Sequence, residues 1–141
     1  MYDRVLLPTD GSEAAEAAAE HAYSLAERYD AELHVLHVVP ENETTAIVGR
    51  GDERLDALEA RGRDAVTPLV EDATARDLSV TSAIEVGTPY RQILAYADEE
   101  DVDIVVMSTH GRSGVGRVVM GSVTERVIRV GETPVVAVPR A

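Results

Sequence analysis

The sequence predicts an α/β fold in which helices cover both faces of one parallel sheet. Strand-like and helix-like segments alternate along the chain, the pattern of βαβ units with right-handed crossovers. Phenylalanine, tryptophan and cysteine are absent although 45% of the residues are hydrophobic, so the core consists of aliphatic side chains, which suit buried parallel strands. The 141 residues fit one domain, residues 1–141, with one core.

Five apolar, β-branched segments predict the strands. They are Val5–Pro8, Leu33–Val39, Val80–Val86, Ile104–Ser108 and Val135–Val138. The segments between them predict helices over Ser12–Tyr29, over Asp52–Asp77, from Thr88-Pro89 onward, and over Ser122–Gly131. The polar segment Glu41–Gly51, which follows the second strand, is expected to form a mobile loop.

The predicted helix boundaries rest on capping signals. Ser12 can cap the first helix, and Thr88 followed by Pro89 is a cap with proline at the first helical position. The spacing of Ser122 and Glu125 is that of a capping box. Pro68 is expected to kink or interrupt the second helix, because proline removes a backbone donor and clashes with the preceding turn.

The charge balance is strongly acidic: 26 acidic residues stand against 13 basic ones, all arginine, and the net charge is −13. Such a chain repels phosphate backbones and anionic membranes, so the sequence argues against nucleic-acid and membrane partners. An acidic, lysine-free composition is typical of proteins from salt-accumulating cells, where counterions screen self-repulsion. An ordinary acidic protein is the alternative.

The chain is expected to be soluble and cytoplasmic. Its apolar runs are far shorter than the roughly 20 residues of a membrane span. Its first residues, Met-Tyr-Asp-Arg, lead directly into a strand pattern without the features of a signal peptide.

Two loops after strands carry the candidate site. In open doubly wound sheets, ligands bind beyond the carboxyl ends of the strands where the strand order reverses. Pro8–Ser12 follows the first strand, and the glycine-rich segment Ser108–Gly116 follows the fourth and leads to Gly121-Ser122 at a helix start. Glycines, a helix N-terminus, Arg112 and Arg117 together predict an anion cradle. A flexible connection that needs glycine only for turning is the alternative.

Two common phosphate-binding motifs are excluded. A Walker A loop requires a lysine, and the chain has none. A dinucleotide fingerprint requires Gly-x-Gly-x-x-Gly directly after the first strand, where this chain has Pro8-Thr9-Asp10-Gly11.

The motifs resemble the universal stress protein family. Its ATP-binding members carry Gly-x-x-Gly, nine residues, then Gly-Ser or Gly-Thr, and this chain has Ser108-Thr-His-Gly111, nine residues, then Gly121-Ser122. The resemblance also covers Val5–Ser12, Leu36–Val38, Gly87–Pro89 and Pro134–Val138. It implies an adenine nucleotide alpha hydrolase-like fold with strand order 3-2-1-4-5 and a homodimer paired through the last strand. Ser108 stands where the ATP-binding members have glycine.

The resemblance further implies roles for individual residues. Asp10 and Val38 are expected at the adenine and ribose end, with Pro8 and Thr9 at the floor. The phosphates are expected at Gly111, Arg112, Gly121, Ser122 and Val123, and the complete set adds Met107, Ser108, Gly114 and Thr124. ATP with Mg²⁺ is the expected ligand, because a lysine-free acidic chain must offset triphosphate charge by other means.

Two functions therefore stay open. The first is an ATP-binding sensor or stress-response module with at most weak hydrolysis, and the second is a nucleotide-independent interaction protein of the same fold. A phosphoryl-transfer enzyme is disfavoured because no general base is evident. His34 and His37 are expected on opposite faces of their strand, in structural roles, because their spacing suits no metal site.

Overall fold

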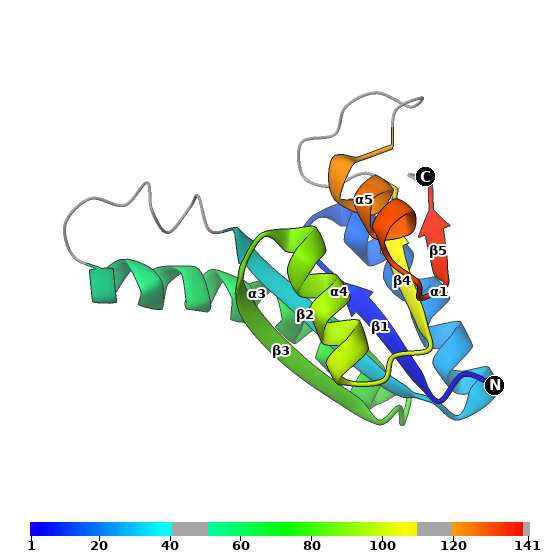
Figure 1. The fold of residues 1–141 in the computed structure, drawn as a ribbon. Helices are drawn as coiled ribbons and strands as arrows, with labels where there is room; N and C mark the ends of the chain where they lie inside the picture. The colour runs from blue at the N-terminus through cyan, green and yellow to red at the C-terminus, as the bar shows by residue number, and fades with distance from the viewer. Residues whose placement is uncertain (41–50, 110–119, 140–141) are drawn as a thin grey trace.

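The fold is a single parallel sheet of five strands, seen in a computed structural model. The structure describes residues 1–40, 51–109 and 120–139. The strands lie in the order β3-β2-β1-β4-β5 (Figure 1). The expected fold class and strand order are both confirmed. The predicted loop at Glu41–Gly51 falls, apart from Gly51, outside the described residues.

The observed strands and helices agree closely with the predicted ones. The strands are β1 (Arg4–Pro8), β2 (Glu32–Pro40), β3 (Val80–Gly87), β4 (Ile104–Ser108) and β5 (Val135–Val138). The helices are α1 (Glu13–Tyr29), α3 (Gly51–Ala75), α4 (Pro89–Glu99) and α5 (Ser122–Val130). None of the helices in the described part of the chain is long and apolar enough to cross a membrane.

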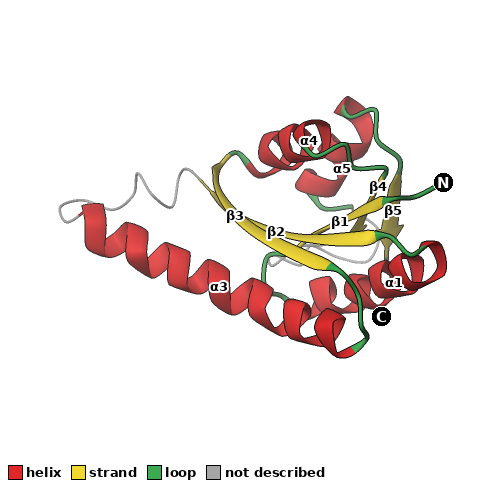
Figure 2. Ribbon diagram, turned by 90° about the horizontal axis from the view of Figure 1, so that it is seen from below, coloured by secondary structure: helices red, strands yellow, loops and turns green. Residues whose placement is uncertain are grey.

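Alternate side chains of the strands pack into two separate cores. Val5 and Leu7 of β1 face α1 and α3, whereas Leu6 faces the other side and packs with Ile93 of α4 and Val127 of α5. Figure 2 shows the resulting three layers, with α1 and α3 on one face of the sheet and α4 and α5 on the other. The strand period of two therefore divides the apolar residues between the two faces.

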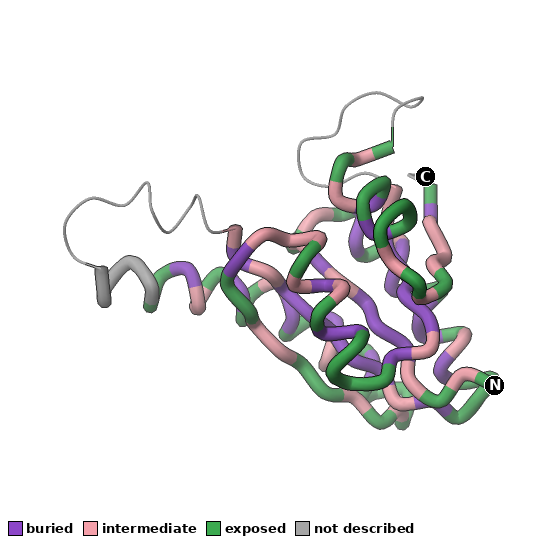
Figure 3. Tube along the Cα trace, viewed as in Figure 1, coloured by how far each residue is buried: buried purple, intermediate pink, exposed green. Residues whose placement is uncertain are grey.

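The deepest burial lies along the central strands. The tube of Figure 3 is purple along the middle of β1 and along β4, and the central residues of β1, Val5 to Leu7, are fully buried. Alanine makes up much of the first core, to which α1 contributes Ala18, Ala19, Ala22 and Ala26. Small side chains allow α1 to lie close to β1 and β4, which fixes the backbone above the carboxyl ends of these strands.

The helix boundaries confirm one capping prediction in full and contradict another. The Ser12 side chain accepts a hydrogen bond from the Ala15 amide at 3.3 Å, as expected of an N-cap. The capping box at Ser122 and Glu125 is wrong, because Gly121 is the N-cap of α5 and no side chain caps the helix. Thr88 is the N-cap of α4 before Pro89, but its side chain makes no capping hydrogen bond.

Pro68 does not interrupt α3, which runs continuously from Gly51 to Ala75. The residues beside it explain why. Val66 and Leu69 are buried in the core against the sheet, and the Tyr23 hydroxyl of α1 donates to the Leu69 carbonyl at 3.1 Å. Pro68 itself is exposed, so water can bond the carbonyl that its missing N–H leaves free.

Candidate functional site

A cavity of about 580 Å³ opens at the carboxyl ends of the central strands. β1 lies between β2 and β4, so the chain order reverses there and the crossovers leave to opposite faces of the sheet. The ends of these strands and the first turns of α4 and α5 border the cavity. This is the place where open doubly wound sheets bind their ligands.

One backbone hydrogen bond and two hydrogen bonds with side chains define the floor of the cavity. The Thr9 amide donates to the Leu36 carbonyl at 2.8 Å, which extends the β1–β2 pairing one residue past the strand. The His37 ring nitrogen Nδ1 lies 2.9 Å from the Thr9 carbonyl. Asp10 accepts from the Ser12 amide at 3.0 Å, so its carboxylate holds the turn into α1. These bonds hold the segment after β1 in one conformation.

One end of the cavity is formed by the N-terminus of α5. The Gly121 amide donates to the Thr109 carbonyl, and the Thr124 hydroxyl donates to the Ser108 carbonyl, each at 2.6 Å. These two bonds tie α5 to the end of β4. Because no side chain caps α5, the amides of its first turn have no partner within the helix and present the positive end of the helix dipole. This end of the cavity therefore favours an anion.

The opposite end of the cavity is apolar. Val39 and Pro40 of β2 line it together with Leu58 of α3. Arg61, one turn after Leu58 on α3, is the only cationic side chain among the described residues that line the cavity. The cavity thus combines an apolar end at β2 and α3 with an amide-rich end at β4 and α5, which lie on either side of β1.

The structure brings together every described residue of the predicted site. These ten residues line the one cavity: Pro8, Thr9, Asp10, Val38, Met107, Ser108, Gly121, Ser122, Val123 and Thr124. The remaining three, Gly111, Arg112 and Gly114, lie outside the described residues. The structure shows that the ten described residues lie together around one cavity. The contacts that each would make with a ligand stay predictions.

Sequence reasoning missed several residues that line the cavity, above all His37 and Arg61. No local motif marks Arg61, and His37, although it lies within the matching segment Leu36–Val38, was expected to have a structural role. Arg61 reaches the cavity because α3 crosses the sheet beside β2, and His37 because its side chain is directed to the α3 face. His34 makes its contact with Tyr96 on the α4 face, so the expectation that the two histidines lie on opposite faces is confirmed.

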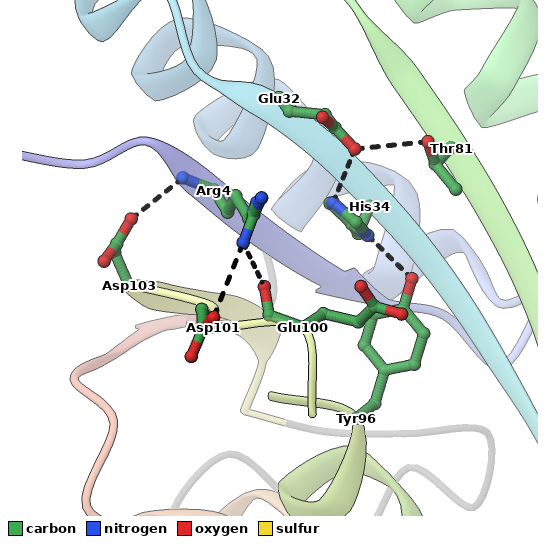
Figure 4. Close-up of polar contacts among 8 residues, drawn as sticks. All are labelled: Arg4, Glu32, His34, Thr81, Tyr96, Glu100, Asp101 and Asp103. Carbon is green, nitrogen blue, oxygen red and sulfur yellow. Dashed lines mark hydrogen bonds and ion pairs between the residues drawn. The ribbon is translucent and has the colours of Figure 1, made fainter. Parts of the chain in front are cut away.

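A second hollow, of about 550 Å³, lies at the amino ends of the strands. Its charged side chains are carboxylates apart from that of Arg4: Asp3, Asp30, Glu32, Asp101 and Asp103. Figure 4 shows that Arg4 is already engaged there, since its amide donates to Asp103 and its guanidinium donates to the Glu100 carbonyl. The hollow therefore disfavours anions. Among the described residues no group of three or more side chains could hold a metal ion.

Beside this hollow, His34 connects β2 to α4. Its Nδ1 lies 2.6 Å from the Tyr96 hydroxyl, and its Nε2 lies 2.8 Å from a carboxylate oxygen of Glu32 (Figure 4). Burial raises the pKa of Tyr96 to about 12, and the charge of Glu100 adds to the shift. His34 thus serves the packing of α4 on the sheet.

The open parallel sheet and the cavity over its central strands define a doubly wound α/β protein, a class that binds ligands at this position. The model of the universal stress protein family matches residues 1–139. The chain belongs to this family.

Individual relatives agree with this assignment. The chain is 30% identical to universal stress protein MJ0577 of Methanocaldococcus jannaschii, with 99% of this chain and 96% of that protein covered. The solved structure of MJ0577 superposes with a TM-score of 0.91 at 32% identity and covers 100% of this chain and 98% of that chain. Universal stress protein UspA from Lactobacillus plantarum superposes with a TM-score of 0.85 at 30% identity, with 97% of each chain covered.

Proposed function

We propose that this universal stress protein binds an adenine nucleotide, ATP with Mg²⁺, in the cavity above β1, and that it acts as a nucleotide-dependent sensor or regulatory module. The observation that carries the proposal is the uncapped N-terminus of α5 at one end of the cavity, opposite an apolar end on β2 and α3. A nucleotide has the same division, with phosphates at one end and a flat, largely apolar base at the other. The volume of about 580 Å³ lies in the usual range for small-molecule sites.

The phosphates belong at the α5 end. The first-turn amides of Ser122 and Val123 supply donors, and the helix dipole supplies a positive potential although the net charge of the chain is −13. Gly111, Arg112 and Gly114 are proposed to complete this end. The base belongs against Val39, Pro40 and Leu58, and the ribose lies between the two ends, near Asp10.

Mg²⁺ would be held mainly by the nucleotide. Asp10 is the only carboxylate among the described residues that line the cavity, and it already accepts the Ser12 amide. Mg²⁺ prefers six oxygen ligands and keeps several waters when a protein offers few. Phosphate oxygens and water therefore supply most of its shell, and the metal reduces the charge that the acidic chain faces.

Two related structures support an adenine nucleotide as the ligand class. One universal stress protein has been solved in complex with cAMP, and that of Archaeoglobus fulgidus in complex with dAMP. They are 23% and 22% identical to this chain, so the likeness extends to the fold alone. These two structures support the proposal only by showing that the fold can accommodate an adenine nucleotide.

The test has two parts. Mass spectrometry of small molecules released from the native protein should detect an adenine nucleotide, and calorimetry at molar KCl should give one ATP site per chain that depends on Mg²⁺. The Gly121→Val variant is the matched control and should bind much more weakly while keeping the fold. Absence of released nucleotide together with absence of binding heat would overturn the proposal in favour of a nucleotide-independent interaction protein.

We also propose a homodimer joined through β5, in a cytoplasmic protein. β5 is an edge strand of the sheet, and Val135, Val136 and Ala137 in it are only half-buried. An edge strand presents unpaired backbone groups to a second strand. The corresponding experiment is given in the Discussion.

A further inference from the structure

We infer that His37 selects the base of the nucleotide by accepting a hydrogen bond from the 6-amino group of adenine. The inference rests on the proposed function and adds to it a side chain that distinguishes 6-aminopurines from 6-oxopurines. His37 is 8% exposed and lies in the lining of the cavity, on the strand that forms its apolar end.

The tautomer of His37 follows from its partner. Nδ1 lies 2.9 Å from the Thr9 carbonyl oxygen, and a carbonyl can only accept, so Nδ1 carries the proton. In a neutral imidazole the other nitrogen, Nε2, then has a free lone pair and acts as an acceptor. The Thr9 backbone is itself fixed by its bond to Leu36, so the ring orientation is set before a ligand arrives.

His37 lines the cavity, and its contacts leave one edge of the ring free. The Nδ1 edge is turned to Thr9, and the Cδ2 edge is turned to α3, where a Cβ on Gly62 would lie 3.1 Å from Cδ2. The edge that remains carries Cε1 and Nε2. Among the described residues Nε2 has no hydrogen-bond partner.

The position of His37 matches that of the base. Neighbouring strands lie about 4.8 Å apart, so β2 and β4, on either side of β1, are roughly 10 Å apart. A nucleotide whose phosphates lie at the α5 end, beside β4, therefore extends across β1 and places its base over β2, beside Val39 and Pro40. Adenine offers a donor at position 6, whereas hypoxanthine offers an oxygen that would face the Nε2 lone pair and leave both acceptors unpaired.

The first experiment compares ATP with inosine triphosphate, which differs in carrying a 6-oxo group and a proton on N1. Calorimetry at constant salt and Mg²⁺ should show ATP binding about tenfold more tightly, the effect of one hydrogen bond. His37→Asn is the informative variant, since an amide can still donate to Thr9 while the Nε2 acceptor is gone, and it should abolish the preference. His34→Gln removes the histidine on the opposite face and should leave the preference unchanged.

The second experiment observes the nitrogen directly. ¹⁵N spectra of the histidines should show the Nε2 signal of His37 moving toward that of a hydrogen-bonded acceptor on addition of ATP, with no such change for inosine triphosphate. Equal binding of the two nucleotides, or an unperturbed His37 signal in the ATP complex, would overturn the inference while leaving the proposed function intact. Failure of both nucleotides to bind would overturn the proposed function and the inference with it.

Discussion

Ser108 ends β4 at the cavity in a conformation that does not require glycine. In the described part of the chain, positive φ angles of non-glycine residues occur at Asp30, Asp77 and Asp101, and not at Ser108. Its carbonyl accepts the Thr124 hydroxyl. A serine in place of the family's glycine is therefore unstrained, and its hydroxymethyl group is small enough to turn away from a ligand.

The prediction is that Ser108→Gly changes ATP affinity less than about tenfold, or about 1.4 kcal/mol. Gly121→Val should reduce the affinity far more, because a branched side chain at the N-cap of α5 obstructs the phosphate end. Gly121 has φ −58° and ψ 147°, which any residue can adopt, so the fold should tolerate the change. Titration of both variants checks this. A large gain from Ser108→Gly, or indifference to Gly121→Val, would contradict it.

Two buried tyrosine side chains are expected to make the stability of the protein depend on pH in the alkaline range. Burial raises the pKa of Tyr23 to about 12, with the charge of Asp72 as the next cause, and burial likewise raises the pKa of Tyr96 to about 12. The ordinary value is 10.0. Between these values the folded state binds more protons than the unfolded state, so this contribution to stability is complete below pH 10 and is lost as the pH rises to about 12.

The expected result is a free energy of unfolding that falls steadily across that window in denaturant titrations. Tyr23→Phe and Tyr96→Phe should each reduce the pH dependence while lowering stability at neutral pH, since they remove the bonds to Leu69 and His34. Tyr29→Phe, at a side chain that is 43% exposed, is the control. A pH profile that is unaltered in both buried-site variants would refute the assignment.

At the scale of elements, β5 has one bonded edge and one open edge. Val105 donates to the Pro134 carbonyl, and Thr109 donates to the Val138 carbonyl. Alternation along a parallel strand then directs the N–H of Val136 toward β4 and the N–H groups of Val135 and Ala137 outward. The outward groups are the ones available to a second copy of the chain.

Ala137→Pro is therefore the discriminating variant for the proposed dimer. It removes an outward donor, so it should shift the mass in light scattering at high salt from dimer to monomer with little change in melting temperature. Val136→Pro should instead lower the melting temperature, because it removes a bond within the sheet. A wild-type chain that is monomeric at high salt, or a dimer unaffected by Ala137→Pro, would refute pairing through β5.

At the scale of the whole molecule, the net charge of −13 is expected to govern how stability depends on salt. The chain carries 26 acidic residues and 13 arginines, and ion pairs such as Arg76 with Glu20 and Arg129 with Glu125 engage only part of the acidic surface. Unpaired carboxylates repel one another more strongly in the compact state than in the unfolded chain. Salt should therefore stabilise the protein by screening this repulsion.

The expected outcome is a melting temperature that falls as KCl is diluted from about 1 M to about 0.1 M, where the screening distance grows from about 3 Å to about 10 Å. Asp98→Asn with Glu99→Gln, which removes two exposed charges at the end of α4, should weaken this salt dependence. An uncharged osmolyte at equal osmolality should not replace the salt. A melting temperature that stays level or rises on dilution would contradict the prediction.

Much of this molecule was predictable from local pattern. Strand and helix periodicity depend on residues two to four positions apart, so the five strands, the four described helices and the Ser12 cap follow from short stretches of sequence. The glycine motif and its neighbours identified the family over nearly the whole chain. The local pattern gave a wrong prediction at Ser122, because the N-cap of α5 is Gly121 and Ser122 is its first helical residue. The Gly121 amide bonds the Thr109 carbonyl, and this tertiary contact, which no local pattern contains, fixes the start of the helix.

The sequence by itself determined the fold class, the family and the end of the sheet where the cavity lies, because periodicity and glycine placement act within one segment at a time. Tertiary structure alone decided that His37 and Arg61 line the cavity and which N–H groups of β5 point outward. The contact of His37 with Thr9 joins positions 28 residues apart, and Arg61 arrives on a helix that crosses beside β2. Such contacts depend on the packing of separate segments, which short-range sequence patterns do not specify.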